Sequence, residues 1–305
     1  MIVKKIGKLI LSVILLLAFI YSIYWLWQRQ PKPAQIKQET TNQVQTPKPQ
    51  KAGFVQVPKD SQILSSGKIE ISGKVDSEAY IVVVSNSTSA IGKSAKDGEF
   101  KIPIELSEEL NLLDIQVFNN NLSAIGSEQK TVYVAEGEPL PQNWEVYAGS
   151  VKSILDNLIT LTTSTGEKSV KKETKTNLIL PSPILSKKPA PAPDESIRIG
   201  DFAIALGEVK DEILNAQDLE IIRENKPQIT RKISIAKILT VAKAGKFSAK
   251  DTEANKILDF TLGKNSTVIK NGQSAKDTDI QKDSNAIIVY QDEDDERLAD
   301  FVYLL

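Results

Sequence analysis

The sequence predicts an all-β protein in which a β-sandwich and two small β-barrel repeats follow a single N-terminal transmembrane helix. Three observations support this prediction. An uncharged apolar run lies near the N-terminus, short segments of alternating apolar and polar residues follow it, and the C-terminal part repeats itself. Alternation with a period of two is typical of strands with one buried face, and self-similarity indicates repeated modules.

The transmembrane prediction rests on residues 9–28, which hold no charged side chain. About 20 apolar residues in a helix cross a hydrocarbon core about 30 Å thick. Aromatic residues gather at the far end of the run, as in an interfacial belt: Tyr21, Tyr24, Trp25 and Trp27. We therefore expect the lipid bilayer to be a partner through residues 9–28.

Lysines set the expected orientation, because short positively charged flanks tend to stay in the cytoplasm. Lys4, Lys5 and Lys8 precede the run, so residues 1–8 are expected inside and the rest of the chain outside the cytoplasm. The alternative is a cleaved secretory signal. Bulky Tyr-Trp-Leu-Trp occupies the positions where a cleavage site needs small residues, which favours an uncleaved signal anchor in the cytoplasmic or plasma membrane.

Composition excludes several function classes. The chain holds 38 Lys/Arg and 39 Asp/Glu, and the first 53 residues contain eight of the former but only Glu39 of the latter, so residues 54–305 are acidic. An acidic body lacks the clustered cations that bind phosphate backbones, so we expect no nucleic-acid partner. The chain has no His and no Cys, which removes Ser-His-Asp and Cys-His catalysis and ordinary zinc sites.

Residues 29–53 are rich in Pro, Gln, Thr and Lys and are expected to form a disordered stalk. Residues 54–137 then show short alternating segments rich in β-branched residues, with an Asp97-Gly98 turn signal before one of them. The expected strands are Ile69–Val75, Tyr80–Val84, Glu99–Ile104, Leu112–Phe118 and Thr131–Val134. Strands at this spacing predict a small antiparallel sandwich.

Several stretches of this region resemble bacterial Ig-like modules of surface and cell-wall proteins: KIEISGKVDSEAYIVV, KDGEFKIPIEL, LNLLDIQVFN and KTVYV. The resemblance covers residues 55–137 and implies an Ig-like β-sandwich with a spacer or adhesive role. It brings no active-site residue with it.

Residues 137–144 read as a linker, and the region after them holds an internal repeat. The segment from Ile197 aligns without gaps with the segment from Ile280, so that Ile204 meets Ile287 and Leu206 meets Val289. Upstream, residues 174–179 (TKTNLI) resemble residues 265–269 (NSTVI). Two homologous modules, residues 145–224 and 229–305, explain the pattern.

Each copy is expected to begin with a strand hairpin and to close with two strands around a polar turn. The expected strands are Gly149–Leu155 and Leu158–Thr163 in the first copy, and Ile233–Lys243 and Ile257–Leu262 in the second. The expected polar turns are Glu208–Asn215 and Gln291–Arg297.

The two copies resemble an uncharacterised family of bacterial extracytoplasmic modules with OB-like β-barrels. The first copy keeps the glycines and alanine of that pattern at Gly149, Gly200, Gly207 and Ala216, whereas the second has Asp283 and Tyr290 in place of Gly200 and Gly207.

Two sequence patterns bear on possible chemistry. Ser-x-x-Lys occurs four times, no more often than composition predicts: Ser65/Lys68, Ser127/Lys130, Ser169/Lys172 and Ser234/Lys237. The acidic run 292–296 lacks the glycine and terminal glutamate of an EF-hand loop, so a solvated hairpin tip is favoured over a calcium site. We expect no catalytic residue, no cofactor and no metal ligand, and hence no enzyme.

Two further elements carry structural expectations. Trp144 is expected to pack between modules. The Pro-rich insertion 181–194 is interpreted as a surface loop, with a docking segment for a partner as the alternative.

These observations predict a membrane-anchored, extracytoplasmic cell-envelope protein with a noncatalytic binding, adhesion or scaffolding role. An envelope protein or wall component is the expected partner. Two alternatives stay open: a subunit of an envelope-spanning assembly, and a carboxylate-dependent hydrolase of cell-wall material.

Overall fold

The computed structural model of the chain describes residues 54–135, 137, 141, 143–181, 196–240, 245–293 and 296–305. The expected transmembrane helix at residues 9–28, the stalk and nearly all of insertion 181–194 lie outside these residues. In the described part, no helix has the length and apolar character to cross a membrane. Contacts group Pro49–Leu305 into one compact unit.

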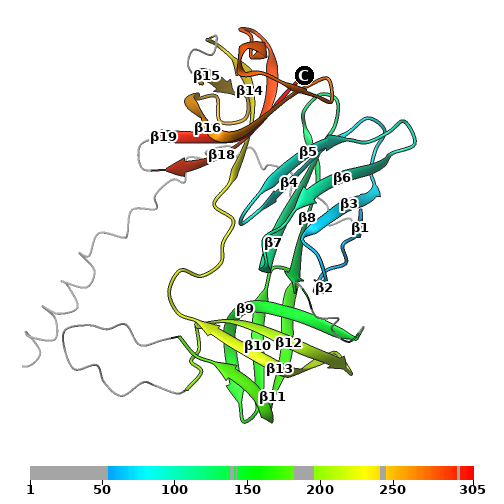
Figure 1. Ribbon diagram of the computed structural model, residues 1–305, viewed down its shortest axis with the longest axis vertical. Coiled ribbons are helices and arrows are strands. Elements are labelled where there is room, and N and C mark those ends of the chain that lie inside the picture. The colour runs from blue at the N-terminus through cyan, green and yellow to red at the C-terminus, as the bar shows by residue number, and fades with distance from the viewer. Residues whose placement is uncertain are drawn as a thin grey trace, which may run out of the picture. The chain divides into compact units, whose positions relative to one another are not determined.

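The described part of the chain is all-β, as predicted, and its one helical element is a short 3₁₀ turn, η1 (Asp277–Asp279). Two facing sheets form the N-terminal sandwich (Figure 1). One sheet has the strand order β1-β3-β6 and the other contributes β2-β8-β7-β4-β5. The strands are β1 (Val55–Val57), β2 (Gln62–Leu64), β3 (Lys68–Lys74), β4 (Tyr80–Ser85), β5 (Ser89–Lys93), β6 (Glu99–Glu105), β7 (Glu109–Phe118) and β8 (Ala124–Val134).

Alternation decides which side chains fill the sandwich. On β6 the burial alternates strictly, with Phe100, Ile102 and Ile104 inward and charged residues or Pro103 outward. These side chains meet Ile81, Val83 and the inward residues of β7 and β8 in one apolar core. Burial of such side chains stabilises the fold by about 1.5–3 kcal/mol each.

A buried ion pair holds the first strand in place. Lys130 and Glu128 of β8 lie 3.1 Å apart, and their side chains are 6% and 17% exposed. Lys130 donates to the carbonyl of Val55 at 3.0 Å, and the amide of Val55 donates to Glu128 at 3.0 Å. Both polar backbone groups of Val55 are thus satisfied by side chains of β8, which fixes β1 where the chain enters the sandwich.

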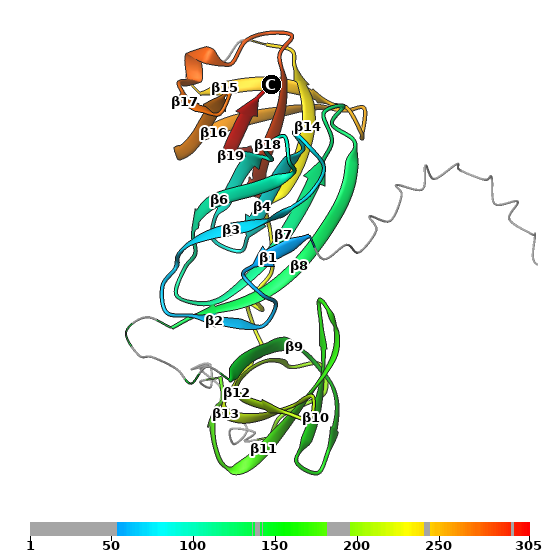
Figure 2. The ribbon, with the colours of Figure 1, turned by 90° about the vertical axis from the view of Figure 1, so that its right-hand side faces the viewer.

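Five strands close into the first barrel (Figure 2). The order is β9-β10-β11-β13-β12, and β9 pairs with both β10 and β12. All neighbours are antiparallel except β11 and β13, which are parallel. The strands are β9 (Trp144–Leu155), β10 (Leu158–Thr163), β11 (Gly166–Ile179), β12 (Phe202–Lys210) and β13 (Ile213–Ile222).

The second barrel repeats this topology. Its order is β14-β15-β16-β19-β18, it closes through the pairing of β14 with β18, and β16 runs parallel to β19. A short strand, β17 (Gln273–Ala275), pairs with the end of β16. The strands are β14 (Lys232–Ile238), β15 (Lys246–Asp251), β16 (Ile257–Lys270), β18 (Asn285–Glu293) and β19 (Glu296–Leu304).

Register in the two barrels agrees with the sequence repeat. Gly207 pairs with Ala216 after a break in the register, and the equivalent Tyr290 pairs with Ala299 after the same break. The gapless alignment of these segments therefore corresponds to matching strands with the same β-bulge. The predicted resemblance upstream also places equivalent strands together, since residues 174–179 and 265–269 lie on β11 and β16.

The second copy closes into a barrel although two glycines of the first copy are replaced in it. Asp283 adopts a positive φ of 67°, where Gly200 of the first copy has a φ of 90°. Tyr290 packs its ring edge against Phe260, with ring centroids 5.3 Å apart, inside the second barrel. An aspartate that tolerates the left-handed region and an aromatic that fills the core thus replace the two glycines.

Several strand bounds differ from the sequence prediction. The polar turn expected at Glu208–Asn215 is narrower, because β12 runs to Lys210, β13 starts at Ile213, and only Asp211 and Glu212 lie between them with positive φ. The strand expected at Ile233–Lys243 ends at Ile238. Three short strands that were not predicted complete the sandwich, namely β1, β2 and β5.

Both barrels contact the sandwich sheet on the face opposite its core. Outward residues of the first barrel, among them Val146, Ile204 and Leu206, pack with Leu110 and Leu112 of β7. The equivalent residues of the second barrel pack with Val82 and Val84 of β4. The matched pairs are Val146 with Ile233, Ala148 with Ile235, Ile204 with Ile287, and Leu206 with Val289. The same face of each barrel, formed by its first and fourth strands, is therefore the docking face.

Candidate functional site

The junction between the sandwich and the second barrel contains a polar pocket, and the tip of the β4–β5 hairpin forms one wall. The Ser85 hydroxyl donates to the carbonyl of Thr88 at 3.1 Å and accepts from the amides of Ser87 and Thr88. The side chain of Asn86 bridges two backbone groups of β7, the carbonyl of Leu110 and the amide of Leu112. These bonds fix the hairpin tip against its own sheet.

A kink in β16 forms the opposite wall. Pairing with β19 is interrupted between Leu262 and Thr267, so residues 263–266 bow out of the ladder. The Ser266 hydroxyl donates to the carbonyl of Ala299, which holds the kink in place. The first barrel has the same device, because the Thr176 hydroxyl donates to the carbonyl of Ala216 at 2.7 Å.

Arg231 joins the hairpin tip to β19, the partner strand of the kinked β16. Its Nε donates to Asp300 at 2.6 Å, and its Nη1 donates to the carbonyl of Asn86 at 3.0 Å. The Arg231 side chain is 12% exposed and that of Asp300 is 26% exposed. The planar guanidinium of arginine carries several N–H donors in a fixed geometry, so one side chain can bind a carboxylate and a backbone carbonyl at the same time.

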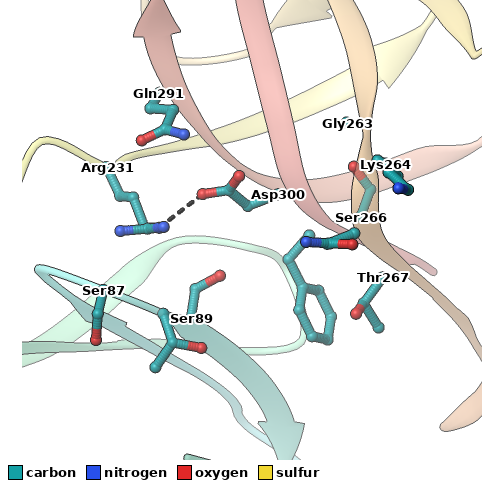
Figure 3. A pocket seen from close by; sticks show the side chains of 12 residues that line it. Ser87, Ser89, Arg231, Gly263, Lys264, Ser266, Thr267, Gln291 and Asp300 are labelled. Carbon is teal, nitrogen blue, oxygen red and sulfur yellow. Dashed lines mark hydrogen bonds and ion pairs between the residues drawn. The ribbon is translucent and has the colours of Figure 1, made fainter. Parts of the chain in front are cut away.

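The pocket between these walls has a volume of about 390 Å³. Figure 3 shows Ser87 and Ser89 on the sandwich side, Ser266 and Thr267 on the barrel side, and the Arg231–Asp300 pair between them. Hydroxyl and amide groups make up most of the lining: Ser87, Thr88, Ser89, Asn265, Ser266, Thr267 and Gln291. Phe301 is the one large apolar side chain that lines the pocket.

The charges of the pocket do not cancel. Arg231 is neutralised by Asp300 at hydrogen-bond distance. Lys264 also lines the pocket, on its exposed rim, and makes no ion pair with any described residue. The remaining charge at the pocket is therefore a single positive one, with all other lining side chains neutral.

An apolar cluster at the same junction packs side chains of the sandwich against side chains of the second barrel. Tyr80 of the sandwich and Tyr303 of the barrel meet edge to face, with ring centroids 5.7 Å apart. Burial raises the pKa of the Tyr303 phenol, and Tyr80 adds to this increase. Edge-to-face aromatic pairs contribute about 0.5–1.5 kcal/mol beyond the area that they bury.

Two other hollows lie on the described part of the chain. One of about 480 Å³ lies on the sandwich around Lys74, Lys93 and Lys101, but Lys101 pairs with Glu70 and Lys93 lies over the ring of Tyr80. The other, of about 430 Å³, lies on the second barrel beside Glu296 and Arg297. Each is built from a single module, whereas the junction pocket takes its walls from two.

Three of the four Ser-x-x-Lys motifs lie within strands, where the serine and lysine are not brought together. Residues three apart on a strand point to opposite faces, which applies to the pairs on β8, β11 and β14. Ser234 is buried and donates to Asp251 at 2.5 Å, while Lys237 pairs with Asp283 at 2.9 Å. Ser234 and Lys237 therefore contact different carboxylates and not each other.

The described residues of the acidic run lie on the facing ends of β18 and β19, where Glu293 pairs with Glu296. Asp292 is engaged by Lys232 at 2.5 Å and by Arg297 at 3.5 Å. No group of three or more carboxylates within the described ranges is placed to hold a metal ion. Trp144 lies half-buried at the start of β9 and pairs with Glu208 of its own barrel.

Sequence reasoning missed the pocket entirely. Its residues come from four separate stretches, near 87–89, at 231, at 263–267 and at 291–301, and each looks like an ordinary polar turn or strand end. Arg231 carries the one available signal, because it stands directly before a strand in a linker and ends up nearly buried.

Comparisons with known proteins add little to this geometry. No protein-family model matches the chain, and no curated protein matches it. One similar solved structure comes from work described as "Structural insight into host cell surface retention of a 1.5-MDa bacterial ice-binding adhesin". It has a TM-score of 0.20 and 10% sequence identity, and the alignment covers 80% of this chain and 92% of that chain. A likeness at this TM-score supports no inference about function.

Proposed function

We propose that this chain is a noncatalytic, membrane-anchored protein of the cell envelope that presents a fixed set of β-modules outside the cytoplasm. Residues 9–28 would anchor it in the bilayer, with residues 1–8 inside. The docking of both barrels on the sandwich carries the proposal. Modules that share apolar junctions form one scaffold for binding, whereas independent beads on a string would each move alone.

The finer fold assignments belong to the same proposal. The first domain would be an Ig-like sandwich, which its two facing, mostly antiparallel sheets support. The barrels would be OB-like modules, because each is a closed five-stranded barrel whose third and fifth strands run parallel. Both kinds of fold serve widely as binding and spacer modules, and neither by itself implies an enzyme.

The natural absence of cysteine allows a direct test of topology. Single-cysteine variants of the full chain, Lys96→Cys in the sandwich and Lys4→Cys before the apolar run, can be expressed in intact cells. A membrane-impermeant maleimide is expected to label the Lys96→Cys variant and to spare the Lys4→Cys variant until the cells are permeabilised. Lys96 suits this purpose because its side chain is exposed in a loop.

The opposite labelling pattern would place the modules in the cytoplasm and contradict the proposal. Loss of the label from the membrane fraction into the medium would instead show a cleaved signal and a released protein. Retention in the membrane with surface labelling is the result that agrees with an uncleaved anchor.

A further inference from the structure

The junction pocket holds polar groups that the protein itself does not use. The side chains of Ser89, Asn265, Thr267 and Gln291 line it, and none of them makes a hydrogen bond to another described residue. Hydroxyls and amides each both donate and accept hydrogen bonds. Such a lining matches a ligand that is itself covered with groups that donate and accept, which is the chemistry of a sugar.

The size and polarity of the pocket favour a small polar ligand over an apolar one. The volume of about 390 Å³ is within the range of small-molecule pockets, about 300–1,000 Å³. Such pockets are usually lined by apolar and aromatic residues. Here Phe301 alone offers a large apolar surface, so a flat aromatic ligand would leave the hydroxyl and amide groups without partners.

The unpaired cation on the rim adds a charge preference. Because Asp300 already neutralises Arg231, Lys264 is the group that can attract a ligand charge. A carboxylate on the ligand would gain a charge-assisted hydrogen bond there, which is about twice as strong as a neutral one.

We propose that the pocket between the β4–β5 hairpin and the β16 kink binds a saccharide unit that carries one carboxylate. This inference rests on the proposed function, for which it names the ligand class. Both walls are needed, so binding requires the second barrel to be docked on the sandwich. The ligand and Arg231 would then bridge the same two modules.

The first barrel supplies a matched control. Its kink in β11 lies at the position equivalent to the kink in β16, and Lys175 stands on it with an exposed side chain. Lys264→Gln removes the rim cation at the pocket, whereas Lys175→Gln removes the same charge from the equivalent kink of the first barrel, which does not line the junction pocket. A third variant, Gln291→Ala, removes one amide from the lining and leaves the charge unchanged.

The experiment measures binding to the full chain in detergent micelles by isothermal titration or ligand-observed NMR. The probes are two matched pairs, glucuronic acid with glucose and N-acetylmuramic acid with N-acetylglucosamine, together with acetate as a bare carboxylate. We expect the acidic sugar of at least one pair to bind and its neutral partner to bind about tenfold more weakly. Lys264→Gln should abolish that preference, Lys175→Gln should preserve it, and Gln291→Ala should weaken both members of the pair.

Several outcomes would overturn the inference. They are no binding of any probe, acetate binding as tightly as the acidic sugars, or equal effects of Lys264→Gln and Lys175→Gln. None of these outcomes would affect the proposed topology, which the maleimide labelling tests separately. Conversely, labelling that places the modules in the cytoplasm would refute the proposed function even if an acidic sugar bound in micelles.

Discussion

Arg231 is the residue on which the second junction depends most. One guanidinium serves a carboxylate of its own barrel and a backbone carbonyl of the sandwich, and its side chain is nearly buried. Removing it would leave the Asp300 carboxylate and the carbonyl of Asn86 without their hydrogen-bond donor. The free-energy cost of leaving such partly buried groups unpaired exceeds the stability that the ion pair itself contributes.

We therefore expect Arg231→Met to lower the free energy of unfolding by about 2 kcal/mol, even though methionine keeps the apolar stem. Urea unfolding followed by tryptophan fluorescence and circular dichroism measures the change. Lys101→Met is the matched control, because the Lys101–Glu70 pair is exposed, with side chains 71% and 52% accessible. Its loss should change stability by less than about 0.5 kcal/mol, and equal effects of the two variants would contradict the assigned role of Arg231.

Asp114 gives the sandwich a pH dependence. Burial raises the pKa of its carboxyl above the ordinary value of 3.8, and the hydrogen bond from Gln116 at 2.9 Å offsets part of this increase. A carboxyl with a raised folded-state pKa binds its proton more tightly when folded. Its contribution to stability is therefore fully present below pH 3.8 and is lost as the pH rises through the folded-state pKa.

Asp114→Asn should remove this dependence. Unfolding midpoints are measured at half-unit steps from pH 3.5 to pH 7. The midpoint of the variant is expected to rise relative to that of the natural protein as the pH increases, so that the variant is the more stable protein at pH 7. The comparison isolates Asp114 because all other carboxyls titrate in both proteins. Parallel pH profiles would mean that Asp114 has the same pKa in the folded and unfolded chain.

Among the strand elements, the β-bulge of the first barrel depends on a glycine. A Cβ on Gly207 would lie 2.1 Å from the carbonyl oxygen of Asn215 in the partner strand. Real Cβ atoms do not approach so closely, so β12 and β13 would have to separate at the bulge. We expect Gly207→Ala to destabilise the protein by about 2 kcal/mol or more.

Gly263 in the second barrel is the control for that substitution. A Cβ there would meet the Ser266 hydroxyl at 3.5 Å, an ordinary contact. Gly263→Ala should therefore change the free energy of unfolding by less than about 0.5 kcal/mol and leave the urea midpoint nearly unchanged. If both alanine variants unfolded at the same urea concentration, the close approach at Gly207 would not be the reason for its glycine.

The sequence could predict those strands that carry a clear apolar pattern over six or seven residues. β4 and β6 were predicted nearly to the residue, because β6 alternates inward apolar with outward residues and β4 is a run of Ile and Val buried on both faces. The repeat was also visible, since Ile204 and Ile287 occupy equivalent positions. Strands of three residues such as β1 and β2 are too short to show a period, and the pairing of β1 depends on Glu128 and Lys130 far along the chain.

The junction pocket could not be predicted for a related reason. Its two walls are a turn of one module and a kink of another, and only tertiary packing brings them together. The alignment did contain the information that Ile287 and Val289 match Ile204 and Leu206, but alternation alone could not show that this outward face is buried. A strand apolar on both faces is the signal that a second surface covers it.

For the molecule as a whole, the shared docking face predicts that the second barrel can be released without being unfolded. Ile287 is fully buried at the junction, while the inward core of its barrel is formed by other residues such as Ile288 and Phe260. Ile287→Asp would place a charge in the apolar junction, where it has no partner, so the docked state loses stability. The barrel core keeps all its contacts.

Limited trypsin digestion of the full chain measures the release, because Arg231 lies at the junction and is shielded only while the barrel is docked. We expect Ile287→Asp to speed cleavage after Arg231 at least tenfold, since cleavage follows the population of the open form. Lys250→Asp, an exposed change on the same barrel, should cleave at the natural rate. Ile204→Asp should release the first barrel in the same way and leave cleavage after Arg231 unchanged. Accelerated cleavage throughout the second barrel would instead mean that Ile287→Asp had unfolded the barrel. The outward face of the second barrel would then be needed for folding and not only for docking, which would contradict the prediction.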